Sequence, residues 1–104
     1  MYRIADAFDT ARQNGRKLLC PFLTAGYPSL AVTPDLLLAA QEAGAGLLEL
    51  GIPFSDPIAD GPVIQASYTH ALSRGGTVDQ FLATVATARK RGLTIPVLAM
   101  ASFS

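Results

Sequence analysis

A single cysteine, no excess charge of either sign and no long apolar run set the first limits on this 104-residue sequence. Cys20 alone excludes a disulfide framework and a four-cysteine zinc site, and it fits a reducing compartment. Eight Lys and Arg residues balance eight Asp and Glu residues, so there is no basic surface for nucleic acid. No segment approaches the roughly 20 apolar residues that cross a bilayer, and the first residues lack the apolar core of a signal peptide. These absences predict a cytoplasmic protein that binds neither nucleic acid nor membrane.

Four segments carry the spacing of apolar residues that is typical of helices. The first resembles a short covering helix. The second begins with Thr33 and Pro34, which predict an N-cap hydroxyl and a proline in the first turn. The fourth begins with Thr77 and Gln80 at the spacing of a capping box. Its expected buried stripe consists of Phe81, Leu82, Val85 and Ala88. The predicted helices cover residues 4–14, 33–43, 63–73 and 77–91.

Three short apolar runs between these helices predict strands at 17–25, 47–51 and 95–100. The first run is almost unbroken, which is typical of a strand buried on both faces. Cys20 within it is therefore interpreted as a small buried hydrophobic residue and not as a nucleophile. Prolines at 53, 57 and 62 exclude the interior of a helix or strand from the segment after the second strand.

The order of these elements, with helices between successive strands, predicts parallel strands and right-handed connections in one unit over residues 1–104. Two architectures stay open, an open doubly wound sheet and the first part of a (β/α)₈ barrel, which needs roughly 250 residues as a whole. The glycines at 44 and 46 precede a strand, so a dinucleotide fingerprint is excluded, and no P-loop is present. In both architectures the functional residues follow the carboxyl ends of the strands.

Glu49 breaks the hydrophobic pattern of the second predicted strand, where the loss of hydration costs a carboxylate most. Near the carboxyl end of a strand it could exchange protons with a ligand in a barrel mouth. The alternative is a carboxylate that accepts hydrogen bonds at the end of the sheet and holds the following loop. Position alone leaves both interpretations open.

Three further polar residues have structural interpretations on residue type alone. Asp60 precedes Gly61 and Pro62, which favours a turn or a cap for the helix that follows. Asp56 before a proline is typical of a turn. His70 has no second ligand or nucleophile at helical spacing, so it is interpreted as a surface or packed histidine.

Two segments resemble the α subunit of tryptophan synthase. They are residues 21–28 (PFLTAGYP) and residues 49–65 (ELGIPFSDPIADGPVIQ). The second is highly specific, because it runs over many consecutive positions that no single secondary structure would require together. The similarity extends in register from about Phe8 to Met100. The resemblance implies the N-terminal part of a (β/α)₈ TIM barrel, through its third strand.

In that family the reaction is the reversible aldol cleavage of indole-3-glycerol phosphate to indole and glyceraldehyde 3-phosphate. The resemblance implies that Glu49 is the acid–base group for protonation of the indole C3 and deprotonation of the side-chain hydroxyl. It also implies that Asp60 stabilises the positive charge that develops on the indole ring. Phe22 and Met100 match positions that line the indole pocket.

The resemblance also implies a partner. The segment that contains Pro53, Asp56 and Pro57 matches a loop that faces the β subunit, in a complex of two α and two β subunits. Pyridoxal phosphate belongs to that β subunit, and the α subunit needs neither a metal nor an organic cofactor.

Two departures accompany the resemblance. Ser102 stands where the family usually has an aromatic residue, and the family's phosphate-binding residues would lie beyond Ser104. We therefore expect both catalytic carboxylates without a complete active site, and no cleavage by the isolated 104 residues. The alternatives are a non-catalytic assembly or interaction fragment, and another phosphate-sugar barrel enzyme of aromatic biosynthesis. The Asp60-Gly61-Pro62 segment argues against the second.

Overall fold

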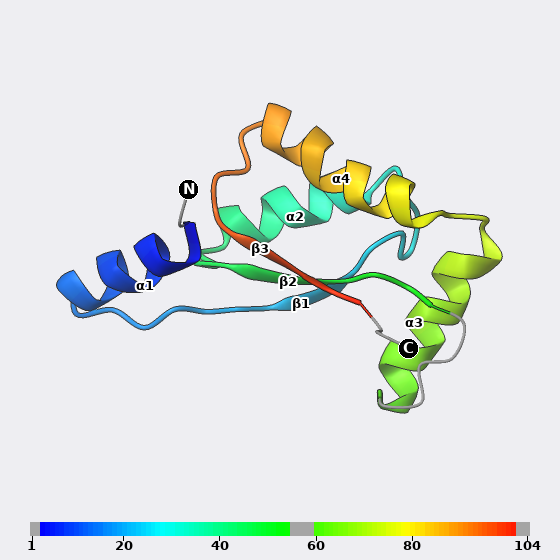
Figure 1. The fold of residues 1–104 in the computed structure, drawn as a ribbon, viewed down its shortest axis with the longest axis horizontal. Coiled ribbons are helices and arrows are strands. Elements are labelled where there is room, and N and C mark those ends of the chain that lie inside the picture. Colours follow the sequence, from blue (N-terminus) through cyan, green and yellow to red (C-terminus); the bar gives the residue numbers. More distant parts are fainter. Residues whose placement is uncertain (1–2, 55–59, 102–104) are drawn as a thin grey trace.

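The computed structural model describes residues 3–54 and 60–101. Along the chain these residues form α1 (Arg3–Gln13), β1 (Phe22–Thr24), α2 (Thr33–Glu42), β2 (Leu48–Gly51), α3 (Pro62–Ser73), α4 (Val78–Lys90) and β3 (Val97–Met100). The strands form a parallel sheet in the order β1-β2-β3, so β2 is central (Figure 1). The predicted parallel β/α fold is confirmed.

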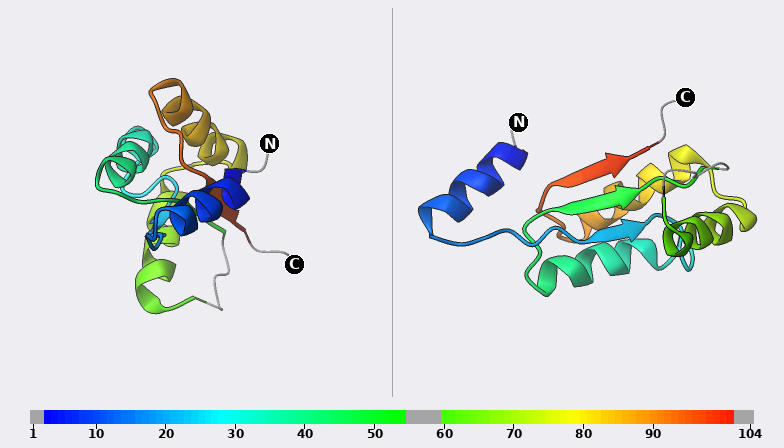
Figure 2. Two further views of the ribbon diagram at one scale, coloured as in Figure 1. Left: turned by 90° about the vertical axis from the view of Figure 1, so that its left-hand side faces the viewer. Right: turned by 90° about the horizontal axis from the view of Figure 1, so that it is seen from below.

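The core lies between the sheet and two helices. α2 and α4 lie next to each other on one face of the sheet (Figures 1 and 2). Leu48 and Leu50 of β2 are fully buried there, together with Leu37 of α2 and Phe81 and Ala88 of α4. Burial of each such leucine stabilises the fold by about 1.5–3 kcal/mol.

The other face of the sheet is open. Within the described part of the chain no helix lies across it, as the right-hand view of Figure 2 shows, although α3 contacts its carboxyl edge through Ser67 and Thr24. Residues paired across a parallel ladder share a face, and so do residues two apart along one strand. This open face therefore carries two rows of residues, Phe22, Glu49 and Leu98, then Thr24, Gly51 and Met100.

The first strand is shorter than the predicted 17–25. Pro21 has no N–H to donate, so the regular ladder starts at Phe22, although the Pro21 carbonyl accepts a 3.0 Å bond from the Glu49 N–H. Leu19 is 60% exposed and Cys20 is exposed. The strand is therefore not buried on both faces, and Cys20 is not a buried hydrophobic residue. Both predictions are wrong because the helices of the described chain cover one face of the sheet only.

The start of α2 differs from its prediction. Val32, not Thr33, stands at the N-cap, and no side chain caps the helix there. The buried Thr33 hydroxyl instead donates to the Ser29 carbonyl (2.8 Å) and accepts from the Gly26 N–H (3.0 Å). It thus fixes the loop between β1 and α2, while Pro34 lies in the first turn as expected.

The start of α4 agrees with its prediction. Thr77 Oγ1 accepts from the Gln80 N–H (3.2 Å), and Gln80 Oε1 accepts from the Thr77 N–H (3.0 Å), which is a complete capping box. The predicted stripe is wrong at Leu82, which is 44% exposed. Thr84 is buried in its place, and its hydroxyl donates to the Phe81 carbonyl at 2.6 Å.

Helix α1 lies beyond the amino ends of the strands (Figure 1). The predicted helix is confirmed, but its apolar side is mostly uncovered. Ala11 is buried, whereas Ile4 and Phe8 are 40% and 48% exposed. α1 therefore covers little of the sheet.

Candidate active site

Glu49 is the second of the four residues of β2, two residues before its carboxyl end, and lies half-buried on the open face of the sheet. Its partners across the ladder are Phe22 and Leu98. Its chain neighbours Leu48 and Leu50 point the other way, into the core. Strand alternation thus explains a carboxylate within an apolar strand. Within the described residues the carboxylate takes part in no hydrogen bond, so nothing there supports the loop-holding alternative.

Cys20 precedes Phe22, the ladder partner of Glu49, by two residues, so the alternation of an extended chain places it on the same side as Glu49. Partial loss of hydration, and then the negative charge of Glu49, raise the pKa of the Cys20 thiol. The two side chains are therefore close enough to interact through their charges. The raised pKa keeps the thiol neutral and a weak nucleophile, which agrees with the prediction that Cys20 is not a nucleophile.

Gly51 ends β2 at a point of close packing. A Cβ atom on this residue would overlap the Phe22 ring and would lie 2.6 Å from the Tyr68 hydroxyl oxygen. Only glycine admits both side chains here. Phe54 continues the cluster, with its ring centroid 5.4 Å from that of Tyr68 at an interplanar angle of 61°. An aromatic cluster thus surrounds the end of the central strand.

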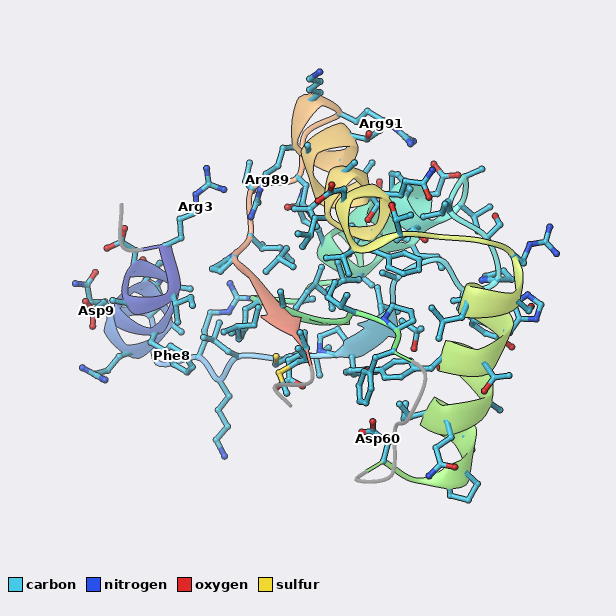
Figure 3. All side chains as sticks on the ribbon, turned by 45° about the vertical axis from the view of Figure 1, so that its right-hand side comes forward. Arg3, Phe8, Asp9, Asp60, Arg89 and Arg91 are labelled. Atoms are coloured by element: carbon cyan, nitrogen blue, oxygen red, sulfur yellow. The ribbon has the colours of Figure 1, made fainter. Side chains whose placement is uncertain are left out.

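Asp60 lies half-buried just before α3. Gly61 is the N-cap of α3 and no side chain caps this helix, so the helix-cap interpretation of Asp60 is wrong. The backbone carbonyl of Asp60 accepts a 2.7 Å bond from Gln65 Nε2, which fixes the chain and leaves the carboxylate available. In Figure 3 the labelled Asp60 side chain lies on the sheet side of the chain trace, away from α3. Burial raises the pKa of Tyr68, and the negative charge of Asp60 is the second cause of this rise.

A buried hydrogen bond holds α3 against the end of β1. Thr24 Oγ1 and Ser67 Oγ are 2.8 Å apart, and Ser67 Oγ also donates to the Ile64 carbonyl at 2.8 Å. Sequence reasoning missed Ser67 and Tyr68, both buried. The signal was present, because they fall on the helical face of Ile64 and Ala71.

The remaining predicted site residues are unevenly placed. Met100 ends β3 in the row of Gly51, 47% exposed, and Pro53 is buried after β2. Asp56 and Pro57, and Ser102 with its departure from the family, lie outside the described residues. His70 is exposed, and its Nε2 donates to the Pro28 carbonyl at 3.0 Å, so its interpretation as a surface histidine is confirmed.

A cavity lies at the opposite end of the sheet. It has a volume of about 740 Å³ between α1 and the amino ends of the strands, and Arg3, Lys17 and Gln41 are among its lining residues. It contains neither Glu49 nor Asp60. In barrels the carboxyl end of the strands carries the chemistry, so this cavity is not the candidate active site.

Residues 3–54 and 60–101 contain neither a candidate metal site nor a membrane-spanning helix. No group of three or more His, Cys, Asp or Glu side chains is placed to hold a metal ion. None of the helices described there is long and apolar enough to span a membrane.

A parallel sheet in the order β1-β2-β3, with α2 and α4 on one face only (Figure 2), is typical of a (β/α)₈ barrel, whereas a doubly wound sheet has helices on both faces. The tryptophan synthase alpha subunit of Legionella pneumophila strain Paris superposes on it with a TM-score of 0.93 at 40% identity, covering 97% of this chain and 38% of that one. The tryptophan synthase complex of Pyrococcus furiosus gives a TM-score of 0.77 at 42% identity, covering 84% and 35%.

The family model of the tryptophan synthase alpha chain matches residues 8–104, and the chain belongs to this family. The alpha chain of Acidovorax ebreus is 49% identical over 100 residues, which are 96% of this chain and 37% of the relative. Tryptophan synthase of Saccharomyces cerevisiae is 43% identical over 102 residues, which are 98% of this chain and 14% of that protein. The chain thus spans 37% or less of these two curated relatives.

Proposed function

We propose that this chain supplies the two catalytic carboxylates for the aldol cleavage of indole-3-glycerol phosphate to indole and glyceraldehyde 3-phosphate. Family membership supports the reaction class. The observation that carries the proposal is the position of Glu49, a half-buried carboxylate on the open face, two residues before the carboxyl end of the central strand. Substrates of barrel enzymes bind at that end.

The reaction needs carboxylates in two different roles, proton exchange and stabilisation of positive charge. The indole C3 gains a proton, and the side-chain hydroxyl loses one as the C–C bond breaks, so one group must exchange protons. Glu49 takes this role, because it has no hydrogen bond to another described residue that would compete for it. Positive charge develops on the ring, and Asp60 stabilises it from beyond the end of the strand.

Phe22 and Met100 form apolar walls beside these carboxylates, one on each side of the central strand. In this proposal residues 1–104 act as a single partial barrel unit and use no metal or organic cofactor of their own. The segment with Pro53, Asp56 and Pro57 faces a β subunit. The structural match to a tryptophan synthase complex supports such a partner.

The test uses a chimeric protein in which residues 1–104 are followed by the remaining part of the Acidovorax ebreus alpha chain. This chimera is the continued chain. We expect the continued chain to form indole from indole-3-glycerol phosphate, with a higher rate when a β subunit is added. The 104-residue chain alone is the comparison, and we expect no indole from it. A folded continued chain without indole formation contradicts the proposal.

A second candidate function is an assembly fragment without catalysis. The free edges of β1 and β3 and the open face within the described chain favour it, because unpaired strand edges bind other strands. Retention of the 104-residue chain on an immobilised β subunit, together with an inactive continued chain, would favour this alternative.

A further inference from the structure

Tyr68 belongs to α3, yet its hydroxyl reaches the open face of the sheet. A Cβ on Gly51 would point to the same face as Glu49, because the two residues are two apart in one strand. That atom would lie 2.6 Å from the Tyr68 hydroxyl oxygen and would also meet the Phe22 ring. The Tyr68 hydroxyl therefore lies beside Phe22, on the face that carries Glu49.

The phenol is held firmly in this position. Tyr68 is only 3% exposed, and its ring packs edge-on against Phe54. The preceding residue, Ser67, is bonded to Thr24 of β1, so the turn of α3 that carries Tyr68 is fixed to the sheet. A buried aromatic side chain has few rotamers, and its oxygen is accordingly well defined in space.

The charges around the phenol agree with this geometry. Burial and the Asp60 carboxylate both raise the pKa of Tyr68, so the phenol stays protonated at neutral pH. The aromatic ring of Phe22 and a neutral hydroxyl thus lie together at the end of β2, and the Asp60 carboxylate is near enough to act on that hydroxyl.

We propose that Tyr68 is a specificity-determining residue of this site, whose hydroxyl lies beside the Phe22 ring at the end of β2 and limits the size of the ring system that binds. The inference rests on the proposed function, because it takes the aromatic ligand to be indole. It does not rest on catalysis, since the hydroxyl acts by occupying space. One additional or missing methyl group in an apolar pocket changes the affinity for the ligand by roughly 10–200-fold.

The test compares the affinities of indole and of its benzo-ring methyl isomers, measured by equilibrium dialysis with the continued chain. Tyr68→Phe removes the oxygen and keeps the ring. We expect at least one methyl isomer to gain about tenfold in affinity relative to indole. Tyr27→Phe is the matched control, because Tyr27 is exposed and packs on His70, and its ratios should equal those of the parent. Tyr68→Leu removes more of the wall and should shift the ratios further.

Unchanged ratios in Tyr68→Phe overturn the inference, and so do equal changes in Tyr68→Phe and Tyr27→Phe. If Tyr68→Leu does not fold, the result for Tyr68→Phe decides. A shifted ratio in a continued chain that forms no indole supports the inference and contradicts the proposed function. Normal indole formation with unshifted ratios supports the proposed function and contradicts the inference. A continued chain that binds no indole at all overturns both.

Discussion

The two ends of the sheet are built in different ways. At the amino end, side chains bond to the backbone of the segment that leads into β3. Gln41 Oε1 accepts from the N–H groups of Thr94 (2.7 Å) and Ile95 (3.2 Å), and its Nε2 donates to the Gly92 carbonyl at 3.0 Å. Arg89 Nη1 donates to the Ile95 carbonyl at 2.6 Å. The polar groups at this end bind the chain to itself.

At the carboxyl end, the carboxylates of Glu49 and Asp60 bond to no other described residue. Close aromatic packing around Gly51 forms their surroundings. The Gln41 and Arg89 side chains thus bond within the fold at one end, whereas the two carboxylates at the other end stay available for a ligand. The contrast agrees with the division in barrels between a structural end and a catalytic end, and it predicts that substitutions at the two ends change different properties.

The largest effect should come from Glu49→Gln in the continued chain. The substitution keeps the size of the side chain and removes its ability to exchange protons. Indole formation should fall by at least roughly 10²-fold, the usual contribution of a general acid–base group, with a nearly unchanged melting temperature. Glu42→Gln, on the exposed end of α2, is the matched control. Parental turnover in Glu49→Gln would remove Glu49 from the mechanism.

Asp60→Asn should have a somewhat smaller effect on turnover, roughly 10- to 100-fold, the range for one interaction with a charged group. Because the Asp60 side chain does not cap α3, we expect normal folding. Phosphate binding should be mostly retained, measured as inhibition by glyceraldehyde 3-phosphate. If circular dichroism shows loss of α3 instead, Asp60 has a structural role at this end and the contrast between the ends fails.

The amino end should respond in stability alone. Gln41→Ala removes bonds to Gly92, Thr94 and Ile95, and we expect the free energy of unfolding to fall by about 1–3 kcal/mol. Turnover per folded continued chain should not change. Urea unfolding gives the free energy, and Gln13→Ala, on an exposed part of α1, should change it by less than about 0.5 kcal/mol. Equal losses in both variants would show that the Gln41 bonds contribute nothing.

Much of the fold could be predicted because its signals are local. The capping box of Thr77 and Gln80 and the proline in the first turn of α2 depend on neighbouring residues only, and each is found where expected. Thr33 failed as an N-cap because its hydroxyl bonds to Gly26 and Ser29, partners that the folded loop brings near. Such bonds leave no mark in the local sequence.

The site was predicted less completely than the fold. Glu49 is visible as a charge among leucines, and the family resemblance gives Asp60 a role that residue type alone did not. Tyr68 was missed because its place at the site depends on its close approach to Gly51, which lies in another element. Cys20 was misjudged because an apolar run shows that a segment suits burial and does not show which faces are covered.

The smallest expected effect lies within the carboxyl end and tests whether Glu49 and Cys20 share the open face. The Glu49 charge is the second cause, after partial loss of hydration, of the raised thiol pKa. Glu49→Gln removes that cause, so the thiol pKa should fall and more thiolate should be present at a given pH. Alkylation of the 104-residue chain by iodoacetamide at pH 8 should therefore become faster by a factor of about two to five, as expected for one charge in partly hydrated surroundings.

The pH–rate profile should move to lower pH, and Glu42→Gln should leave it unchanged. Coincident profiles for the parent and Glu49→Gln would mean that the carboxylate does not face Cys20, and the placement of Glu49 at the site would lose its support.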